Sequence, residues 1–176
     1  MTKQFNTGET QETLRQEYNP DGSVLRRAQM RMLDMAIYLQ ETAKKIGVPL
    51  RLDGGNVLGA LRHGGFIPWD DDIDMVVSQK DFKRLCDYLK AHPHPHYVLQ
   101  DNSTDRGFYK EWACLRDLRT ENRSHETSES ENRRIHEAQK YRGLHVDIFP
   151  YEGNMIPWLQ RFAAKLSVNV NLKMAG

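Results

Sequence analysis

Four aspartates stand within five consecutive positions near the middle of the chain: Asp70, Asp71, Asp72 and Asp74. The last of them belongs to an apolar run, residues 73–77, that predicts a buried β-strand. On a strand, the side chains of Asp72 and Asp74 point to one face while the apolar side chains between them point to the other. Two carboxylates about 7 Å apart on one face repel each other unless a cation lies between them. Because hard oxygen ligands favour Mg²⁺ or Mn²⁺, the cluster predicts a divalent metal site.

A further aspartate, Asp147, stands alone in a second apolar run, residues 145–149. This run also predicts a strand. A third carboxylate on a neighbouring strand would complete the arrangement that enzymes use for two-metal phosphoryl transfer. The alternative is an acid at a sheet edge or a loop cap, and both interpretations stay open.

A glycine pair, Gly54 and Gly55, precedes a short helical pattern and lies about fifteen residues before the acidic cluster. Glycine lets the backbone approach a ligand closely, and free N–H groups at a helix N-terminus bind phosphate. Arg62 and His63, at the far end of that pattern, and Arg116, on a later strand, could neutralise the same phosphate. Each of these three is also compatible with an ordinary surface or cap role.

The longest helical pattern has apolar residues every seven positions, which predicts a helix with one buried face. Ser23 is suited to cap its start, and Gly47 followed by Pro49 ends it. A second helix is predicted after Ser78, where Asp81 three residues on resembles a capping box. The apolar stripe of the long helix comprises Leu25, Met32, Leu39 and Ile46, with Ala28, Met35, Ala36 and Ala43 beside it.

Short apolar runs predict strands at 50–52, 73–77, 97–100, 112–118 and 144–149. Residues 121–140 are rich in mixed charge, Ser, Asn and Glu, which indicates a long exposed loop or a marginal helix, often a mobile cover over a site. From Pro157 onward, apolar residues spaced at four predict a last helix. Its stripe of Trp158, Phe162 and Leu166 either packs in the core or lies on a membrane.

The composition suits one globular domain, which we expect at 23–176 after a flexible tail at 1–22. The net charge of +1 gives no global attraction to nucleic acid. Two cysteines, Cys86 and Cys114, form no disulfide framework and indicate reduced thiols. The N-terminus resembles no signal peptide, and no uncharged apolar run is long enough to span a membrane. The expected location is the cytoplasm, with the inner face of the membrane as a further place of contact.

The segment from Asp53 to Asp74 resembles the signature of the LicD family and reads DGGNVLGALRHGGFIPWDDDID. The segment from Val146 to Pro150, VDIFP, resembles the family's second motif. That family includes bacterial phosphocholine transferases and the fukutin-related ribitol-phosphate transferases. The similarity extends over residues 24 to 165.

The resemblance implies an α+β, nucleotidyltransferase-like (polymerase-β-type) fold with a mixed sheet flanked by helices. It also implies transfer of a phospho-alcohol, such as phosphocholine, from a CDP-activated donor to a sugar hydroxyl of a teichoic acid, lipopolysaccharide, capsule or glycoprotein. Matched by position, the family's glycine pair corresponds to Gly54 and Gly55, and its metal ligands correspond to Asp72, Asp74 and Asp147.

The chain differs from the family's pattern in two respects. Asn56 stands where the family often has a small hydroxyl residue, so one donor contact is expected to differ. Family members are commonly longer, and this chain ends inside a helical pattern, so a missing C-terminal segment is expected.

The resulting hypothesis is a metal-dependent phosphotransferase in which Asp72, Asp74 and Asp147 hold Mg²⁺ or Mn²⁺ against the diphosphate of the donor. An acceptor hydroxyl attacks in line and CMP leaves, with Asp147 or Asp71 as the proton acceptor. Three alternatives stay open: a nucleotidyltransferase that moves a nucleoside monophosphate, a catalytically silent module that binds sugar phosphates, and a partner-binding scaffold that uses the last helix. The groups expected to hold substrate are Gly54, Gly55, Arg62, His63, Asp71 and Arg116.

Overall fold

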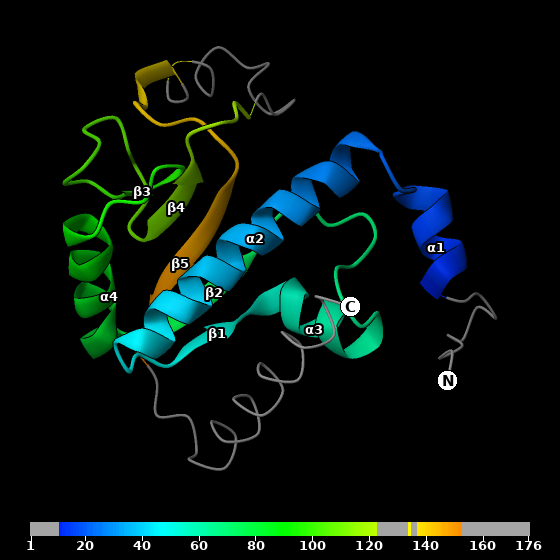
Figure 1. Cartoon of the computed structure of the whole chain (residues 1–176), viewed down its shortest axis with the longest axis horizontal. Helices are drawn as coiled ribbons and strands as arrows, with labels where there is room; N and C mark the ends of the chain where they lie inside the picture. Colours follow the sequence, from blue (N-terminus) through cyan, green and yellow to red (C-terminus); the bar gives the residue numbers. More distant parts are fainter. Residues whose placement is uncertain (1–10, 123–133, 135–136, 153–176) are drawn as a thin grey trace.

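A five-stranded mixed sheet forms the centre of the computed structural model, which describes residues 11–122, 134 and 137–152 (Figure 1). The sheet order is β1-β2-β5-β4-β3, in which β2 and β5 run parallel and the other neighbours run antiparallel. Each strand expected from the sequence is present, with ends shifted by at most two residues. The strands are β1 (Leu50–Leu52), β2 (Asp74–Ser78), β3 (Tyr97–Gln100), β4 (Ala113–Asp117) and β5 (His145–Tyr151).

The position of β5 decides which side chains meet. Although β5 follows the other four strands in the chain, it pairs between β2 and β4. Its parallel register with β2 places Asp147 directly beside Asp74, and its antiparallel register with β4 places Asp147 beside Cys114. The two halves of the acidic constellation, 73 residues apart in sequence, therefore become neighbours in the sheet.

Four helices are described: α1 (Gln11–Tyr18), α2 (Val24–Lys45), α3 (Gly54–Arg62) and α4 (Gln79–Ala91). The expected caps of α2 are present, because the Ser23 hydroxyl accepts a hydrogen bond from the Arg26 N–H at 3.0 Å. At its other end, Gly47 N–H bonds to Lys44 O and Val48 N–H bonds to Ala43 O, which is the Schellman pattern. Together, these helices and the mixed sheet confirm the expected mixture of helix and strand.

The hydrophobic core lies between one face of the sheet and helices α2 and α4. Because side chains alternate along a strand, Met75 and Val77 of β2 share this face with Val146 and Ile148 of β5. Leu39 of α2 is fully buried against them in the same cluster. Figure 1 shows α2 running diagonally across the strands. Asp74 and Asp147, which alternate with these apolar residues, therefore belong to the opposite face.

The N-terminal segment differs from the expectation of a loose tail at 1–22. Residues 11–18 form helix α1, while residues 1–10 lie outside the described part. Asn19 is almost fully buried, and its amide donates to Gln29 Oε1 of α2 at 2.8 Å. The Tyr18 ring meets the Trp69 ring edge to face, with centroids 5.2 Å apart. Polar composition suggested a tail, but the buried Asn19 amide and the Tyr18 ring join the end of this segment to the domain.

The start of α4 also differs in detail. Ser78 occupies the N-cap position, as expected, but its hydroxyl donates to the Asp81 carboxylate at 2.7 Å instead of capping the backbone. The predicted helix beyond Pro157 and most of the predicted cover at 121–140 lie outside the described residues. Among the helices that the structure does describe, none is both long and apolar enough to cross a membrane.

Candidate functional site

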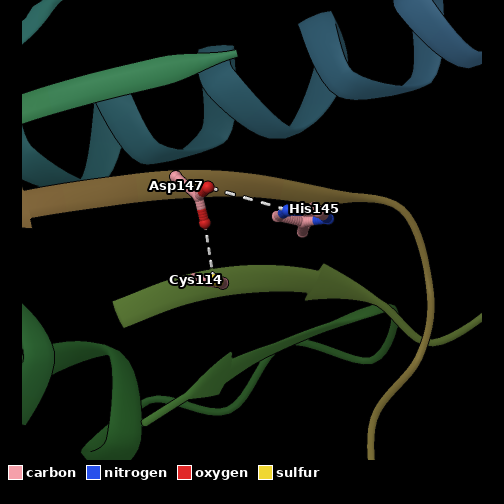
Figure 2. A group of neighbouring side chains, drawn as sticks. All are labelled: Cys114, His145 and Asp147. Carbon is pink, nitrogen blue, oxygen red and sulfur yellow. Dashed lines mark hydrogen bonds and ion pairs between the residues drawn. The ribbon is translucent and has the colours of Figure 1, made fainter. Parts of the chain in front are cut away.

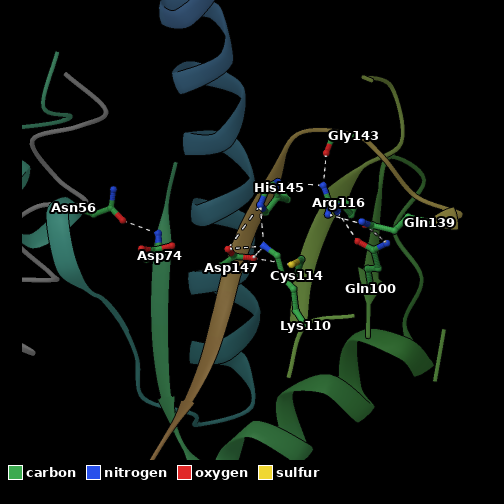
Figure 3. A network of polar contacts seen from close by, with 10 residues as sticks. All are labelled: Asn56, Asp74, Gln100, Lys110, Cys114, Arg116, Gln139, Gly143, His145 and Asp147. Carbon is green, nitrogen blue, oxygen red and sulfur yellow. Dashed lines mark hydrogen bonds and ion pairs between the residues drawn. The ribbon is translucent and has the colours of Figure 1, made fainter. Parts of the chain in front are cut away.

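A row of polar side chains crosses four neighbouring strands on the face opposite the core. The strand register aligns Asp74 of β2, Asp147 of β5, Cys114 of β4 and Gln100 of β3. Figure 3 shows the row, with α2 passing behind the strands. Where such polar side chains are buried, they need compensation by hydrogen bonds or counterions. The compensation differs from one end of the row to the other.

At the β2 end, the acids gather with little positive charge near them. Ligand oxygens of Asp70, Asp71 and Asp72 all lie within 4.8 Å of one another. Burial, followed by the charges of Asp72 and Asp71, raises the pKa of Asp70 to about 6. Burial, followed by Asp72 and Asp147, likewise raises the pKa of Asp74 to about 6, and the pKa of Asp72 is raised by burial and by Asp71. These carboxylates repel one another, which is the condition that a bound cation relieves.

Asn56 fixes the backbone that carries these acids. Its amide Nδ2 donates to Asp72 O at 3.1 Å, and its Oδ1 accepts from the Asp74 N–H at 2.5 Å. Because Asn56 is in the first turns of α3 and is almost fully buried, this pair of bonds ties α3 to the start of β2 (Figure 3). Asn56 therefore holds the acidic segment in position.

The glycine pair stands directly against the acids. Gly54 has a φ of +50°, in the left-handed region that side chains with a Cβ rarely adopt. A Cβ on Gly54 would lie 3.9 Å from Asp74 Oδ2, and one on Gly55 would lie 3.2 Å from Asp70 Oδ2. Both glycines are exposed, and they begin α3 beside these carboxylates. The structure thus brings Gly54 and Gly55 together with the metal-ligand candidates.

The surroundings of Asp147 are different, because positive and hydrogen-bonding groups hold it. Lys110 Nζ lies 3.0 and 3.2 Å from its two carboxylate oxygens, and the Cys114 thiol donates to Oδ1 at 2.7 Å. His145 Nε2 is 3.7 Å from Oδ2 (Figure 2). Burial alone would raise the pKa of Asp147, but the neighbouring His145, the Lys110 ammonium and the Cys114 hydrogen bond bring it below its ordinary value. Asp147 is therefore held ionised.

Arg116 takes a structural place that the sequence did not indicate. Its guanidinium is buried and donates to Gln100 Oε1, Gln139 Oε1 and Gly143 O, and its Nη1 lies 3.1 Å from His145 Nδ1 (Figure 3). These contacts engage all three guanidinium nitrogens with groups of the protein itself, and the expected phosphate-binding role of Arg116 stays a prediction.

Arg62 and His63 lie at the C-terminal end of α3, the opposite end from the glycine pair. Arg62 Nε donates to His63 Nε2 at 2.9 Å, and the His63 ring meets the Trp69 ring at 6.3 Å between centroids. Burial lowers the pKa of His63, followed by the charge of Arg62. His63 also lines a separate cavity of about 230 Å³ between α1, α2 and the loop at 64–68. The structure therefore does not bring this pair to the acids.

The donor set at the acidic end fits a hard divalent cation. Its members offer carboxylate oxygens, the ligands that Mg²⁺ and Mn²⁺ prefer. One of these oxygens, Asp70 Oδ2, is buried and has no hydrogen-bond partner among the described residues. Orphaned buried carboxylate oxygens are costly unless a cation or a water satisfies them.

A second group of possible ligands, Cys114, His145 and Asp147, fits a soft metal less well. Arginine only donates hydrogen bonds, so the Arg116 contact makes His145 Nδ1 an acceptor, while Nε2 lies 3.4 Å from Lys110 Nζ and 3.7 Å from Asp147 Oδ2. Burial also raises the pKa of the Cys114 thiol, whose proton already bonds to Asp147. These groups position Asp147 instead of offering an open set of ligands.

Sequence reasoning missed Lys110 and the positioning role of Asn56. Lys110 lies in the polar segment between β3 and β4, where no periodic pattern indicates which face of the sheet its side chain reaches. Asn56 was noticed only as a departure, although an amide beside a glycine pair is suited to bridge two backbone groups. The exposed Asp71 and Asp72 lie beside Asp70, as the sequence predicts.

Comparison with known proteins places these residues in a family context. The sequence pattern described as "LicD/FKTN/FKRP, nucleotidyltransferase domain" matches residues 47–165, which include the glycine pair, the acidic cluster and Asp147. The chain is 30% identical over 131 residues to the lipopolysaccharide cholinephosphotransferase LicD of Haemophilus influenzae, an alignment that covers 73% of this chain and 44% of that protein.

Two further relatives are the ribitol 5-phosphate transferases FKRP of Mus musculus and Homo sapiens. Each is 32% identical over 120 residues, which cover 64% of this chain and 20% of the relative. The chain thus spans less than half the length of each of these three relatives. The match of the family pattern extends over more than half of the chain, and the chain therefore belongs to the LicD/FKTN/FKRP family.

Proposed function

We propose that this domain is the catalytic part of a divalent-metal-dependent phosphotransferase. It moves a phospho-alcohol from a CDP-activated donor to a hydroxyl of a glycan or lipid-linked glycan. The observation that carries the proposal is the pairing of Asp74 with Asp147 on parallel strands, beside Asp72 and the exposed glycine pair at the start of α3. Carboxylates and free amides in one place suit an ion and a phosphate bound side by side.

The printed names of the relatives support this class of reaction. One relative is named a cholinephosphotransferase and two are named ribitol 5-phosphate transferases, so each name describes transfer of an alcohol joined to phosphate. The matched family pattern is described as a nucleotidyltransferase domain, and we propose the polymerase-β-type version of that fold for this chain. The donor's nucleotide, the alcohol and the glycan belong to the proposal.

In the proposed mechanism, Asp72, Asp74 and Asp147 hold Mg²⁺ or Mn²⁺. When bound, the ion would offset the negative charge that develops on the transferred phosphoryl group. The N–H groups of Gly54 and Gly55 bind donor phosphate oxygens. The acceptor hydroxyl oxygen bonds to the phosphorus that carries the alcohol, and the bond from that phosphorus to CMP breaks.

The proton of the attacking hydroxyl needs an acceptor within the site. Both oxygens of Asp147 already contact Lys110, and Oδ1 also accepts from Cys114. Asp71 is exposed at the edge of the cluster. We therefore propose Asp71 as the proton acceptor. Where the acceptor glycan is lipid-linked, the reaction takes place in the cytoplasm at the inner face of the membrane.

The decisive test follows two labels in one donor. CDP-choline carrying ¹⁴C in choline and ³²P in the phosphate attached to cytidine is incubated with the protein, Mg²⁺ and lipopolysaccharide. The proposal predicts ¹⁴C in the glycan and ³²P in free CMP. The matched variants are Asp72→Asn/Asp74→Asn, expected to be inactive, and Asp87→Asn on the exposed side of α4, expected to behave as wild type.

Each other outcome selects a different function. Recovery of ³²P in the glycan identifies a nucleotidyltransferase, because the acceptor hydroxyl has then attacked the labelled phosphorus. The bond between that phosphorus and the bridging oxygen breaks, and the oxygen leaves with phosphocholine. Metal-dependent binding of the donor without transfer of either label, for any glycan of the classes named above, identifies a silent phosphate-binding module. Both outcomes contradict the proposed phosphotransferase.

A further inference from the structure

Lys110 takes no part in the mechanism proposed above, yet its ammonium contacts Asp147 in the row of polar side chains. It lies in the segment between β3 and β4, and its side chain is 14% exposed. Its Nζ lies 3.0 and 3.2 Å from the two oxygens of Asp147, 3.4 Å from His145 Nε2 and 5.1 Å from the centre of the Trp112 ring. Figure 3 shows the ammonium directed at Asp147.

This contact conflicts with the use of Asp147 as a metal ligand. Because one ammonium engages both carboxylate oxygens at 3.0 and 3.2 Å, a metal ion bound to either oxygen at about 2 Å would lie no more than about 5 Å from that positive charge. Two like charges at such a separation repel strongly, even at the effective dielectric constant of a protein surface. One cation must therefore yield, and lysine has a flexible four-carbon stem that allows its ammonium to move.

The rest of the network stays in place when Lys110 moves. The Cys114 thiol still donates to Asp147, and Arg116 still orients His145 from the opposite side. The displaced ammonium remains beside a site that would hold a diphosphate. Lysine binds phosphate well as a point charge, so a displaced Lys110 has an anionic partner within the same site.

We propose that Lys110 is a stand-in cation that neutralises Asp147 before the metal binds and then becomes a ligand of the donor's diphosphate. This inference rests on the proposed function, because it takes Asp147 as a metal ligand and a CDP-linked compound as the substrate. A stand-in cation differs from a structural ion pair in how metal affinity changes when the lysine is removed. A structural lysine supports Asp147, so its removal weakens metal binding, whereas a stand-in cation competes with the metal, so its removal strengthens metal binding.

The test measures Mn²⁺ binding to the nucleotide-free protein, from the electron paramagnetic resonance signal of unbound Mn²⁺. Lys110→Met is expected to bind Mn²⁺ about tenfold more tightly than wild type. At saturating Mn²⁺, the same variant is expected to bind CDP about tenfold more weakly. Lys110→Arg keeps the charge and is expected to bind Mn²⁺ no more tightly than wild type. Lys90→Met is the matched control. Lys90 forms its ion pair with Asp101, at 2.9 Å between Nζ and Oδ2, and not with the acids of the candidate site.

Unchanged or weaker Mn²⁺ binding by a folded Lys110→Met protein overturns the inference, as does unchanged CDP binding. If wild type binds no Mn²⁺, the metal site of the proposed function fails first, so the two failures are distinguishable. If the variant does not fold, the acetylation of Lys110 in wild type tests the same proposal. The protein is treated with acetic anhydride, and peptide mass spectrometry measures the acetylated fraction of each lysine. We expect Lys110 to be protected from acetylation in the protein without additions and to become reactive when Mn²⁺ is present. It should be protected again when Mn²⁺ and CDP are both present, and Lys90 serves as the internal reference. Equal reactivity in all three states contradicts the proposal.

Discussion

Asp74 is the residue at which the charges of the site converge. Burial raises the pKa of its carboxyl to about 6, together with the negative charges of neighbouring acids. These acids are Asp72, Asp147, Asp53 and Asp70. A carboxyl whose pKa is raised in the folded protein stabilises the fold below its ordinary pKa, near 3.8, and loses that contribution as the pH rises through 6. At neutral pH, the metal-free protein therefore carries a destabilising charge in this position.

Replacing that charge with an amide should stabilise the metal-free protein. At pH 7.5 in EDTA, Asp74→Asn is expected to be more stable than wild type by about 1 kcal/mol, after a discount for solvent screening. The corresponding rise in Tm is about 2–4 °C, and it should vanish as the pH falls from 6 to 4. Mg²⁺ should reverse the order, because it stabilises wild type alone. Thermal unfolding by circular dichroism measures both effects, and a variant less stable than wild type in EDTA would contradict this account of the charges.

Asn56 acts through the backbone. Asn56→Ala leaves Asp72 O and the Asp74 N–H without their partner, and we expect a loss of about 2–3 kcal/mol in the free energy of unfolding. The control is Asn102→Ala, because Asn102 is exposed and its amide donates to Lys110 O at 3.3 Å. Its free energy of unfolding is expected to change by less than about 0.5 kcal/mol. Urea unfolding monitored by tryptophan fluorescence compares the two variants. Equal stability of Asn56→Ala and wild type would show that the two bonds do not hold the segment.

The sequence predicted that the acids and the glycine pair belong to one candidate site, because each forms a short pattern that can be recognised locally. The acids and the glycine pair occur in short patterns whose spacing reveals their direction on a strand or at a helix start. Arg116 was placed among the phosphate-binding groups because a basic residue on a strand says nothing of its neighbours. Its burial depends on Gln100, Gln139 and His145, which come from three separate segments. Lys110 was missed for the same reason.

At the scale of the elements, α3 and the loop that follows it position the glycine pair relative to the acids. The loop is held from one side by Gln29 of α2, whose buried amide donates to Asp70 O at 2.7 Å and to Ile67 O at 3.3 Å. From the other side, Gly59 lets α3 approach the loop. A Cβ at Gly59 would lie 2.6 Å from Gly65 O and 3.0 Å from Ile67 N.

This close approach predicts opposite outcomes for two glycines of the same segment. Gly59→Ala forces the loop backbone away from α3 and is expected to cost about 1–3 kcal/mol in the free energy of unfolding. Gly65→Ala meets no atom within 4 Å and is expected to change that free energy by less than about 0.5 kcal/mol. Urea denaturation of both variants makes the comparison. If both alanines were equally tolerated, the loop would not depend on the contact with α3.

The element boundaries followed from the sequence because caps and apolar runs are local signals. The sheet order did not, because pairing β5 between β2 and β4 depends on contacts between residues far apart in the chain. Helix α1 was missed because residues 11–18 bury no side chain fully and so lack an apolar stripe. Contacts at its end, such as Asn19 with Gln29, hold that segment in place instead.

At the scale of the whole molecule, the sheet separates two kinds of chemistry. One face packs against α2 and α4 as a hydrophobic core, and the other carries the row of polar groups from Asp74 to Gln100. The core holds the strands in register, and the register brings carboxylates from distant parts of the sequence together. We propose that these carboxylates bind a divalent ion and that the ion in turn binds a CDP-linked donor.

Calorimetric titration of CDP-choline, and then CDP-ribitol, with and without Mg²⁺, tests that claim most directly. Wild type, Asp72→Asn/Asp74→Asn and the surface control Asp87→Asn are compared. We expect heat of binding for at least one donor, only with Mg²⁺. The control variant should keep this binding and the double variant should lose it. Binding that ignores Mg²⁺, survives in the double variant, or is absent for both donors at saturating Mg²⁺ would contradict the claim.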